Sequence, residues 1–155
     1  MRKQRPFIVV FMAVCVCLVG ACSSSDSASD SEAESAVDCT AVGPGVDLHG
    51  CDMTLEADLT GADLTGANLS NADLTEVDLA NANLTNARLD NADLSNANLT
   101  NANLTNADLY YADLLETDLT DANLTGAKLT DASWDQTICP DGSVQSLRCN
   151  RTATG

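Results

Sequence analysis

A five-residue unit repeats without interruption from residue 57 to residue 136, and it limits the folds open to this chain more than any other feature. The sixteen units follow the pattern Ala-(Asp/Asn)-Leu-x-x, beginning ADLTG ADLTG ANLSN and ending AKLTD ASWDQ. We number the positions of each unit 1 to 5, so that Ala stands at position 1 and Leu at position 3. A short repeat sustained over this length indicates a stack of similar structural units.

A period of five fits neither an α-helix nor a flat strand. In an α-helix, successive leucines would be rotated by roughly 140° and would encircle the axis instead of forming one apolar stripe. In a straight strand, an odd period would point alternate leucines to opposite faces. If the chain turns once per unit, every Leu and Ala can face one interior while the other positions face water. The repeat therefore predicts a solenoid whose coils pair through their backbones.

The predicted core consists of the position 3 side chains, with tryptophan at the last unit. The small Ala at position 1 suits a narrow lumen, and only Val77 and Thr117 depart from it. The core residues are Leu59, Leu64, Leu69, Leu74, Leu79, Leu84, Leu89, Leu94, Leu99, Leu104, Leu109, Leu114, Leu119, Leu124, Leu129 and Trp134.

In this pattern the chain resembles the pentapeptide-repeat family, and the resemblance covers about half of its length. The resemblance implies an all-β fold, a right-handed quadrilateral β-helix with one unit on each side. The residues alone leave the number of sides open. A four-sided coil would stack Asp108 between Arg88 and Lys128, whereas a three-sided coil would place Arg88 beside Asp73 and Lys128 beside Asp113, which is equally favourable.

The N-terminal region is typical of a bacterial lipoprotein signal. Three cations within the first five residues precede an apolar stretch over 7–19 that is too short to span a bilayer. The sequence VGAC at 19–22 resembles a lipobox, so Cys22 would become an acylated N-terminus that holds the protein on a membrane. Secretion with cleavage nearby and retention of an uncleaved anchor stay open as alternatives.

These features divide the chain into five predicted segments. Residues 46–50 and 51–55 resemble degenerate units, and Glu56 adds one residue that predicts a bulge before the main run. The Ser- and acid-rich stretch after Cys22 has no bulky apolar residue with which to fold. The segments are a signal peptide (1–21), a disordered Ser/Asp-rich linker (22–37), an N-terminal cap (38–56), the β-helix (57–136) and a Cys-bounded C-terminal cap and tail (137–155).

Four cysteines would remain after removal of the signal and lipidation, one pair on each side of the repeats. Four coils at about 4.8 Å each give a rod about 19 Å tall, so pairs at its two ends cannot share one zinc ion. In an oxidising compartment, the simplest pairing is two local disulfides, Cys39 with Cys51 and Cys139 with Cys149. Such loops would cover the exposed ends of a solenoid.

The charge balance is strongly acidic. The full chain carries −16, and after loss of the signal four Lys/Arg remain against 23 Asp/Glu, a net charge near −19. This balance argues against binding of nucleic acid or an anionic membrane through the rod. In a four-sided coil, Asp73, Asp93 and Asp113 would form a ladder of like charge, which we interpret as a solvated surface.

Three apolar residues interrupt the outward-facing polar pattern: Tyr110, Tyr111 and Leu115. Exposed aromatic residues often mark contact sites, so these three are the candidate interaction patch. The alternative is that they only pack on one another across a corner.

Two other functions are kept as alternatives. One is an acidic DNA mimic of the gyrase-binding type known in the family, and the other is a surface-adsorbing, ice-binding-like threonine row formed by Thr65, Thr85, Thr105 and Thr125.

No catalytic, metal or cofactor site is expected. His49 is the only histidine and has no partner in the pattern, so we interpret it as a surface residue. The sequence therefore predicts a non-catalytic scaffold or protein-interaction module in the cell envelope, outside the cytoplasm and lipid-anchored through Cys22. Its expected partner is an unidentified envelope protein and not a nucleic acid, and homodimerisation is left open.

Overall fold

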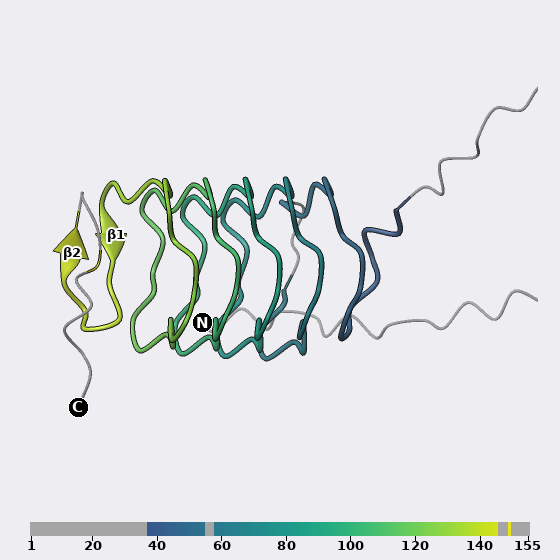
Figure 1. Cartoon of the computed structure of the whole chain (residues 1–155), viewed down its shortest axis with the longest axis horizontal. Coiled ribbons are helices and arrows are strands. Elements are labelled where there is room, and N and C mark those ends of the chain that lie inside the picture. Colours follow the sequence, from purple (N-terminus) through teal and green to yellow (C-terminus); the bar gives the residue numbers. More distant parts are fainter. Residues whose placement is uncertain (1–36, 55–57, 146–148, 150–155) are drawn as a thin grey trace, which may run out of the picture. The chain divides into compact units, whose positions relative to one another are not determined.

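The computed structural model describes residues 37–54, 58–145 and 149. Predictions for the signal peptide, Cys22, most of the linker and Glu56 lie outside these residues. The described chain winds into a stack of similar coils that ends in a short hairpin, and no helix appears in it (Figure 1). None of the described residues belongs to a helix with the length and hydropathy needed to cross a bilayer.

The register between coils shows that the solenoid has four sides. Parallel bridges join residues twenty apart, such as Asp58 with Asp78 and Asn83 with Asn103. Twenty residues are four units, so the three-sided alternative is excluded. Before the main run the offset is 21 residues, as in Asp52 with Asp73. This offset agrees with the one extra residue that the sequence predicts at the entrance to the repeats.

The corners are β-turns built from positions 3, 4 and 5 and the next position 1, and most of them are closed by a hydrogen bond from the position 1 N–H to the position 3 carbonyl. At one corner, the Ala82 N–H donates to the Leu79 carbonyl at 3.0 Å, and Asn81 between them has φ of 61°. At the same time the Leu79 N–H donates to the Asn98 carbonyl of the next coil at 2.8 Å. Turn and ladder together pair most of the backbone groups of the inner coils, and the position 4 N–H donates instead to the position 2 side chain, as Thr85 does to Asn83 Oδ1. Short bridged segments can therefore replace long strands.

Position 5 adopts the left-handed conformation in all sixteen units, with φ between 53° and 73°. Asn, Gly and Asp tolerate this region best, and they occupy position 5 in most units. The exceptions are Glu76, Tyr111, Glu116 and Gln136. A corner that requires this conformation explains the Asn-rich fifth position, which the apolar pattern alone does not.

Replacing Glu76 with Asn should therefore stabilise the fold. Glu76 is exposed with φ of 63°, and Asn relieves part of a left-handed cost of about 1 kcal/mol. We expect the free energy of unfolding in urea to rise by up to about 1 kcal/mol. Glu76→Ala is the control, since Ala removes the same charge without favouring the conformation. Equal stability of the Asn and Ala variants would contradict the interpretation.

Leucine side chains fill the lumen as the repeat predicts, with one difference at the C-terminal end. The position 3 residues from Leu59 to Leu119 are buried, and Trp134 is 3 % exposed. Leu124 and Leu129, predicted as core, are only half-buried and pack against its edge. They belong to the last coil, where the described chain adds a further layer over only part of the lumen.

The two departures from Ala at position 1 lie on the same side of the solenoid. Val77 and Thr117 are forty residues apart, so two coils separate them on one face. Both are buried, and the Thr117 hydroxyl donates to the Leu94 carbonyl at 2.7 Å. This corner of the lumen thus accepts a β-branched side chain, and the buried hydroxyl has a partner there.

Disulfides close both ends of the described stack, with the pairing that the sequence predicts. Cys39 bonds Cys51, and Cys139 bonds Cys149. At the C-terminal end, β1 (Thr137–Ile138) continues the column of Asp118, and β2 (Val144–Gln145) pairs with it antiparallel. The hairpin therefore extends one face of the solenoid and pairs the outer edge of that face.

Candidate interaction surface

The four faces of the solenoid differ in chemistry, and we name them from their position 2 columns. The hairpin face carries Asp58, Asp78, Asn98, Asp118 and Ile138; the amide face carries Asp63, Asn83, Asn103 and Asn123; the mixed-charge face carries Asp47, Asn68, Arg88, Asp108 and Lys128; the acid face carries Asp52, Asp73, Asp93, Asp113 and Ser133.

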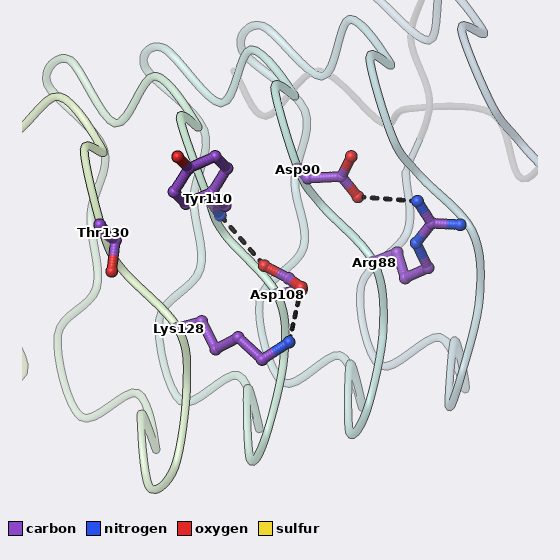
Figure 2. A pocket seen from close by; sticks show the side chains of 6 residues that line it. All are labelled: Arg88, Asp90, Asp108, Tyr110, Lys128 and Thr130. Atoms are coloured by element: carbon purple, nitrogen blue, oxygen red, sulfur yellow. Dashed lines mark hydrogen bonds and ion pairs between the residues drawn. The ribbon is translucent and has the colours of Figure 1, made fainter.

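The mixed-charge face holds the only cations of the repeats, and they stack around an aspartate as the four-sided coil predicts. Bridges join Arg88 to Asp108 and Asp108 to Lys128. Lys128 Nζ lies 2.8 Å from Asp108 Oδ2, whereas the Arg88 guanidinium turns to Asp90 of its own unit at 3.3 Å (Figure 2). The two cations therefore pair with different carboxylates, Lys128 with Asp108 of the preceding coil and Arg88 with Asp90 of its own unit.

Asp90 is held from two sides. The Ser70 hydroxyl, buried in the coil below, donates to Asp90 Oδ1 at 2.6 Å. Partial burial by itself raises the pKa of this carboxyl, but the hydrogen bond from Ser70 and the charge of Arg88 outweigh it and hold the pKa below its usual value. The carboxylate is therefore ionised and fixed in direction.

Two adjacent tyrosines project from this face. Tyr110 is 40 % exposed and Tyr111 is 52 % exposed, and their ring centroids lie 4.2 Å apart in an edge-on arrangement. Tyr111 also occupies the left-handed corner position with φ of 57°, which is unfavourable for a bulky side chain. Proximity to Tyr111, mainly through a hydrogen bond, raises the pKa of Tyr110 above its usual value.

A shallow hollow of about 390 Å³ lies beside the first tyrosine, and we call it the tyrosine hollow. Residues of three successive coils line it: Arg88, Asp90, Asp108, Tyr110, Lys128 and Thr130 (Figure 2).

The predicted interaction patch is only partly brought together. Tyr110 and Tyr111 contact each other, while Leu115 lies on the neighbouring acid face and is half-buried. We call these three residues the aromatic corner. Sequence reasoning stacked Arg88 and Lys128 around Asp108 but assigned neither of them, nor Asp90 or Thr130, to an interaction site. A twenty-residue register applied to the whole sequence would have found them, because they share two adjacent columns with Asp108 and Tyr110.

Threonine hydroxyls on the amide face are engaged within the protein. Thr85 donates to Asn83 Oδ1 at 2.7 Å and accepts from Asn103 Nδ2 of the next coil at 2.9 Å. The same pattern of donors and acceptors recurs at Thr65 and Thr105. Because each hydroxyl has one hydrogen, these threonines have no donor left for water. The threonine row thus forms a ladder that ties neighbouring coils together.

The acid face stacks Asp73, Asp93 and Asp113 as predicted for four sides, with Asp52 below them. Each carboxylate accepts the backbone N–H two residues ahead, as Asp93 does from Ser95 at 2.9 Å. Among the described residues, no group of three or more His, Cys, Asp or Glu is arranged to hold a metal ion. His49 is exposed at position 4 of the mixed-charge face.

Comparison with known proteins decides the family. The model of pentapeptide repeats matches residues 57–96 and 97–133, in eight copies. This chain belongs to the pentapeptide-repeat family. Its members fold as right-handed quadrilateral β-helices, which is the four-sided fold described above.

Several solved pentapeptide-repeat proteins are similar to the chain. It is 37 % identical to HetL of the cyanobacterium Nostoc, a protein involved in heterocyst differentiation regulation, over 66 % of this chain and 50 % of HetL, with a TM-score of 0.46. A thylakoid-lumen protein of Arabidopsis thaliana is 24 % identical over 64 % of this chain and 68 % of its own, with a TM-score of 0.59. The chain spans half the length of HetL. None of the proteins with curated functions matches it significantly.

Acid should weaken this pentapeptide-repeat solenoid through Asp63, a position 2 carboxylate whose pKa is lowered. Asp63 accepts from the Thr65 hydroxyl at 2.6 Å and from its backbone N–H at 3.2 Å, and these bonds lower the pKa of Asp63. A folded-state pKa below the unfolded one adds stability above about pH 4, and this is lost as pH falls through the folded value. We therefore expect the urea midpoint to fall between about pH 5 and pH 2.

Asp63→Asn is the matched test, because Asn83 accepts the same bonds from Thr85 without a charge that titrates. The Asn variant should lose less stability on acidification than the wild type. If the two proteins show the same change in urea midpoint with pH, this carboxylate does not contribute in the way its hydrogen bonds indicate.

Proposed function

We propose that this pentapeptide-repeat protein is a non-catalytic scaffold of the cell envelope that binds an envelope protein through the aromatic corner. The observation that carries the proposal is a tyrosine kept at a strained corner. Twelve of sixteen units place Gly, Asn or Asp at position 5, yet Tyr111 stands there with φ of 57° and is 52 % exposed. Strain retained at an exposed aromatic residue is typical of a functional site.

The surroundings support a contact surface at this place. Within the repeats, Tyr110 and Tyr111 are the exposed large hydrophobic residues among those described, and the cations of the repeats lie on the same face. Tyrosine and arginine are enriched at the energetic centres of protein interfaces. The regular backbone of the coils holds these side chains in fixed positions, which lowers the entropy lost on binding.

The proposed location is the outer side of a membrane, with the protein held by lipid on Cys22. The basic start, the apolar stretch and VGAC at 19–22 support export and acylation. Two disulfides in the described chain agree with an oxidising compartment. Mass spectrometry of the mature N-terminus tests the anchor directly. An unmodified Cys22, or an intact signal peptide, would contradict it.

Crosslinking in intact cells followed by mass spectrometry tests the protein contact. The wild type is compared with the double variant Tyr111→Asn/Leu115→Ser. These replacements are the residues found at the equivalent positions one coil earlier, Asn91 and Ser95. Loss of two contact residues should lower recovery of the crosslinked partner about tenfold or more. Thr120→Ala on the hairpin face is the control. Equal recovery from wild type and double variant would refute the aromatic corner as the contact.

The two alternatives have separate tests. A DNA-mimicking rod should inhibit DNA gyrase in a supercoiling assay, although the ion pairs of Arg88 and Lys128 interrupt the negative charge on one of its faces. A surface-adsorbing threonine row should give thermal hysteresis, but the hydroxyls of Thr65, Thr85 and Thr105 already donate to neighbouring side chains. No observation favours either function over protein binding.

A further inference from the structure

We infer that the tyrosine hollow is a binding site for a neutral saccharide. This activity is separate from the protein contact proposed above, and the hollow shares only Tyr110 with the aromatic corner. Three properties of the hollow carry the inference: an exposed aromatic ring, donors and acceptors of balanced charge, and side chains that are already fixed.

The aromatic ring supplies a platform for the apolar face of a sugar. Tyr110 stands on the middle of three coils, with Arg88 and Asp90 on one side of it and Lys128 and Thr130 on the other (Figure 2). Tyr110 is 40 % exposed, and its ring is supported edge-on by Tyr111 at a centroid distance of 4.2 Å. The hollow is shallow and has a volume of about 390 Å³.

The charges around the ring select a neutral, hydroxyl-rich ligand. The charges around the ring cancel in two ion pairs, Arg88 with Asp90 and Lys128 with Asp108. The cationic side chains are the more exposed, 59 % and 68 % against 23 % and 29 % for the carboxylates, so donors stand at the rim with acceptors beneath them. A free cation is repelled by the exposed Arg88 and Lys128, and an anion is repelled by the net charge of the chain, which is −16 in full and near −19 after loss of the signal. Hydroxyl groups can use both kinds of partner, since they donate and accept.

The acceptors are fixed before any ligand arrives. Ser70, which is buried, donates to Asp90 Oδ1 at 2.6 Å, and the Tyr110 N–H donates to Asp108 Oδ1 at 3.3 Å. The outer carboxylate oxygen of Asp90 has no hydrogen bond to other described residues. Carboxylates held in this way lose little freedom when they accept hydroxyl hydrogens from a sugar.

Titration of the mature protein with saccharides, followed by nuclear magnetic resonance, tests the inference. The probes are trisaccharides of glucose, mannose, galactose and N-acetylglucosamine, with trigalacturonate as a charged comparison. At least one neutral probe should bind with a Kd of about 1 mM or tighter. Tyr110→Thr should weaken that binding about tenfold or more; Thr is chosen because Thr130 occupies the equivalent position one coil later. Thr120→Ala on the hairpin face should not change the binding.

Three results would overturn the inference: no neutral probe shifts the resonances of the hollow, only trigalacturonate does, or Tyr110→Thr binds like the wild type. Leu115→Ser separates this site from the protein contact, because Leu115 belongs to the aromatic corner and does not line the hollow. That variant should bind saccharide normally even where its crosslinking is reduced, so each proposal can fail without the other.

Discussion

Replacing Leu99 with Asp is expected to unfold the solenoid. Leu99 is fully buried in the middle of the stack, and its N–H donates to the Asp118 carbonyl of the next coil at 2.8 Å. A carboxylate at this position would lie in a dry lumen with no cation near it. Burying an unpaired polar or charged group costs several kcal/mol, comparable with the 5 to 15 kcal/mol total stability of a typical domain.

Circular dichroism during heating measures this effect. The variant should show no cooperative transition, or one lowered by tens of degrees. Asn101→Asp is the matched control: it adds the same charge two residues away, at an exposed corner where Asp121 and Asp131 show that Asp is accepted. A Leu99→Asp protein that melts within a few degrees of the wild type would show that this leucine does not face a closed core.

Removing the C-terminal disulfide should give the second large effect on stability. Stability should be lost first at the C-terminal end of the stack. Cys139 and Cys149 close a loop of sequence separation 10 that holds the β1–β2 hairpin on the end of the solenoid. Such a bond stabilises a fold by about 2 to 4 kcal/mol. In a solenoid each coil contacts only its neighbours, so fraying should begin beside the lost cap.

Hydrogen exchange on a Cys139→Ser/Cys149→Ser variant tests this polarity. The amides of Leu119 and Ile138, which pair the hairpin to the last coil, should lose protection first, and that of Leu64 should keep it longest. The matched control, Cys39→Ser/Cys51→Ser, should reverse the order. Equal loss of protection along the stack in both variants would show that the solenoid opens as one unit.

The sequence predicts the solenoid because the same constraint recurs in sixteen units. Each unit requires one turn, one inward Leu and one small neighbour, so errors at single positions do not accumulate. It does not show where the stack ends. For this reason the repeat pattern predicts Leu124 and Leu129 as core residues, although both are half-buried. A repeat pattern describes the interior of an array and carries no information about the layer that covers its last coil.

The candidate site was harder to predict, because it depends on register and on side-chain direction. Three or four sides satisfy the charges of Arg88 and Lys128 equally well in the sequence, and only the backbone bridges decide between them. Even with the register known, Arg88 turns to Asp90 and not to Asp108 of the next coil. Ser70 beneath Asp90 helps to fix that choice, a contact between residues twenty apart that no local pattern shows.

The central claim is that the backbone completes one coil every twenty residues, and engineered disulfides test it most directly. Asn83 and Asn103 are bridged in parallel, so cysteines placed there lie at the roughly 4.8 Å spacing that a disulfide requires. Cleavage after Arg88 separates the two positions, so peptide mapping under oxidising conditions reveals the bond. The account predicts that Asn83→Cys/Asn103→Cys crosslinks within the monomer, and that Asn83→Cys/Asn98→Cys, fifteen residues apart, does not. The reverse result would contradict the four-sided coil.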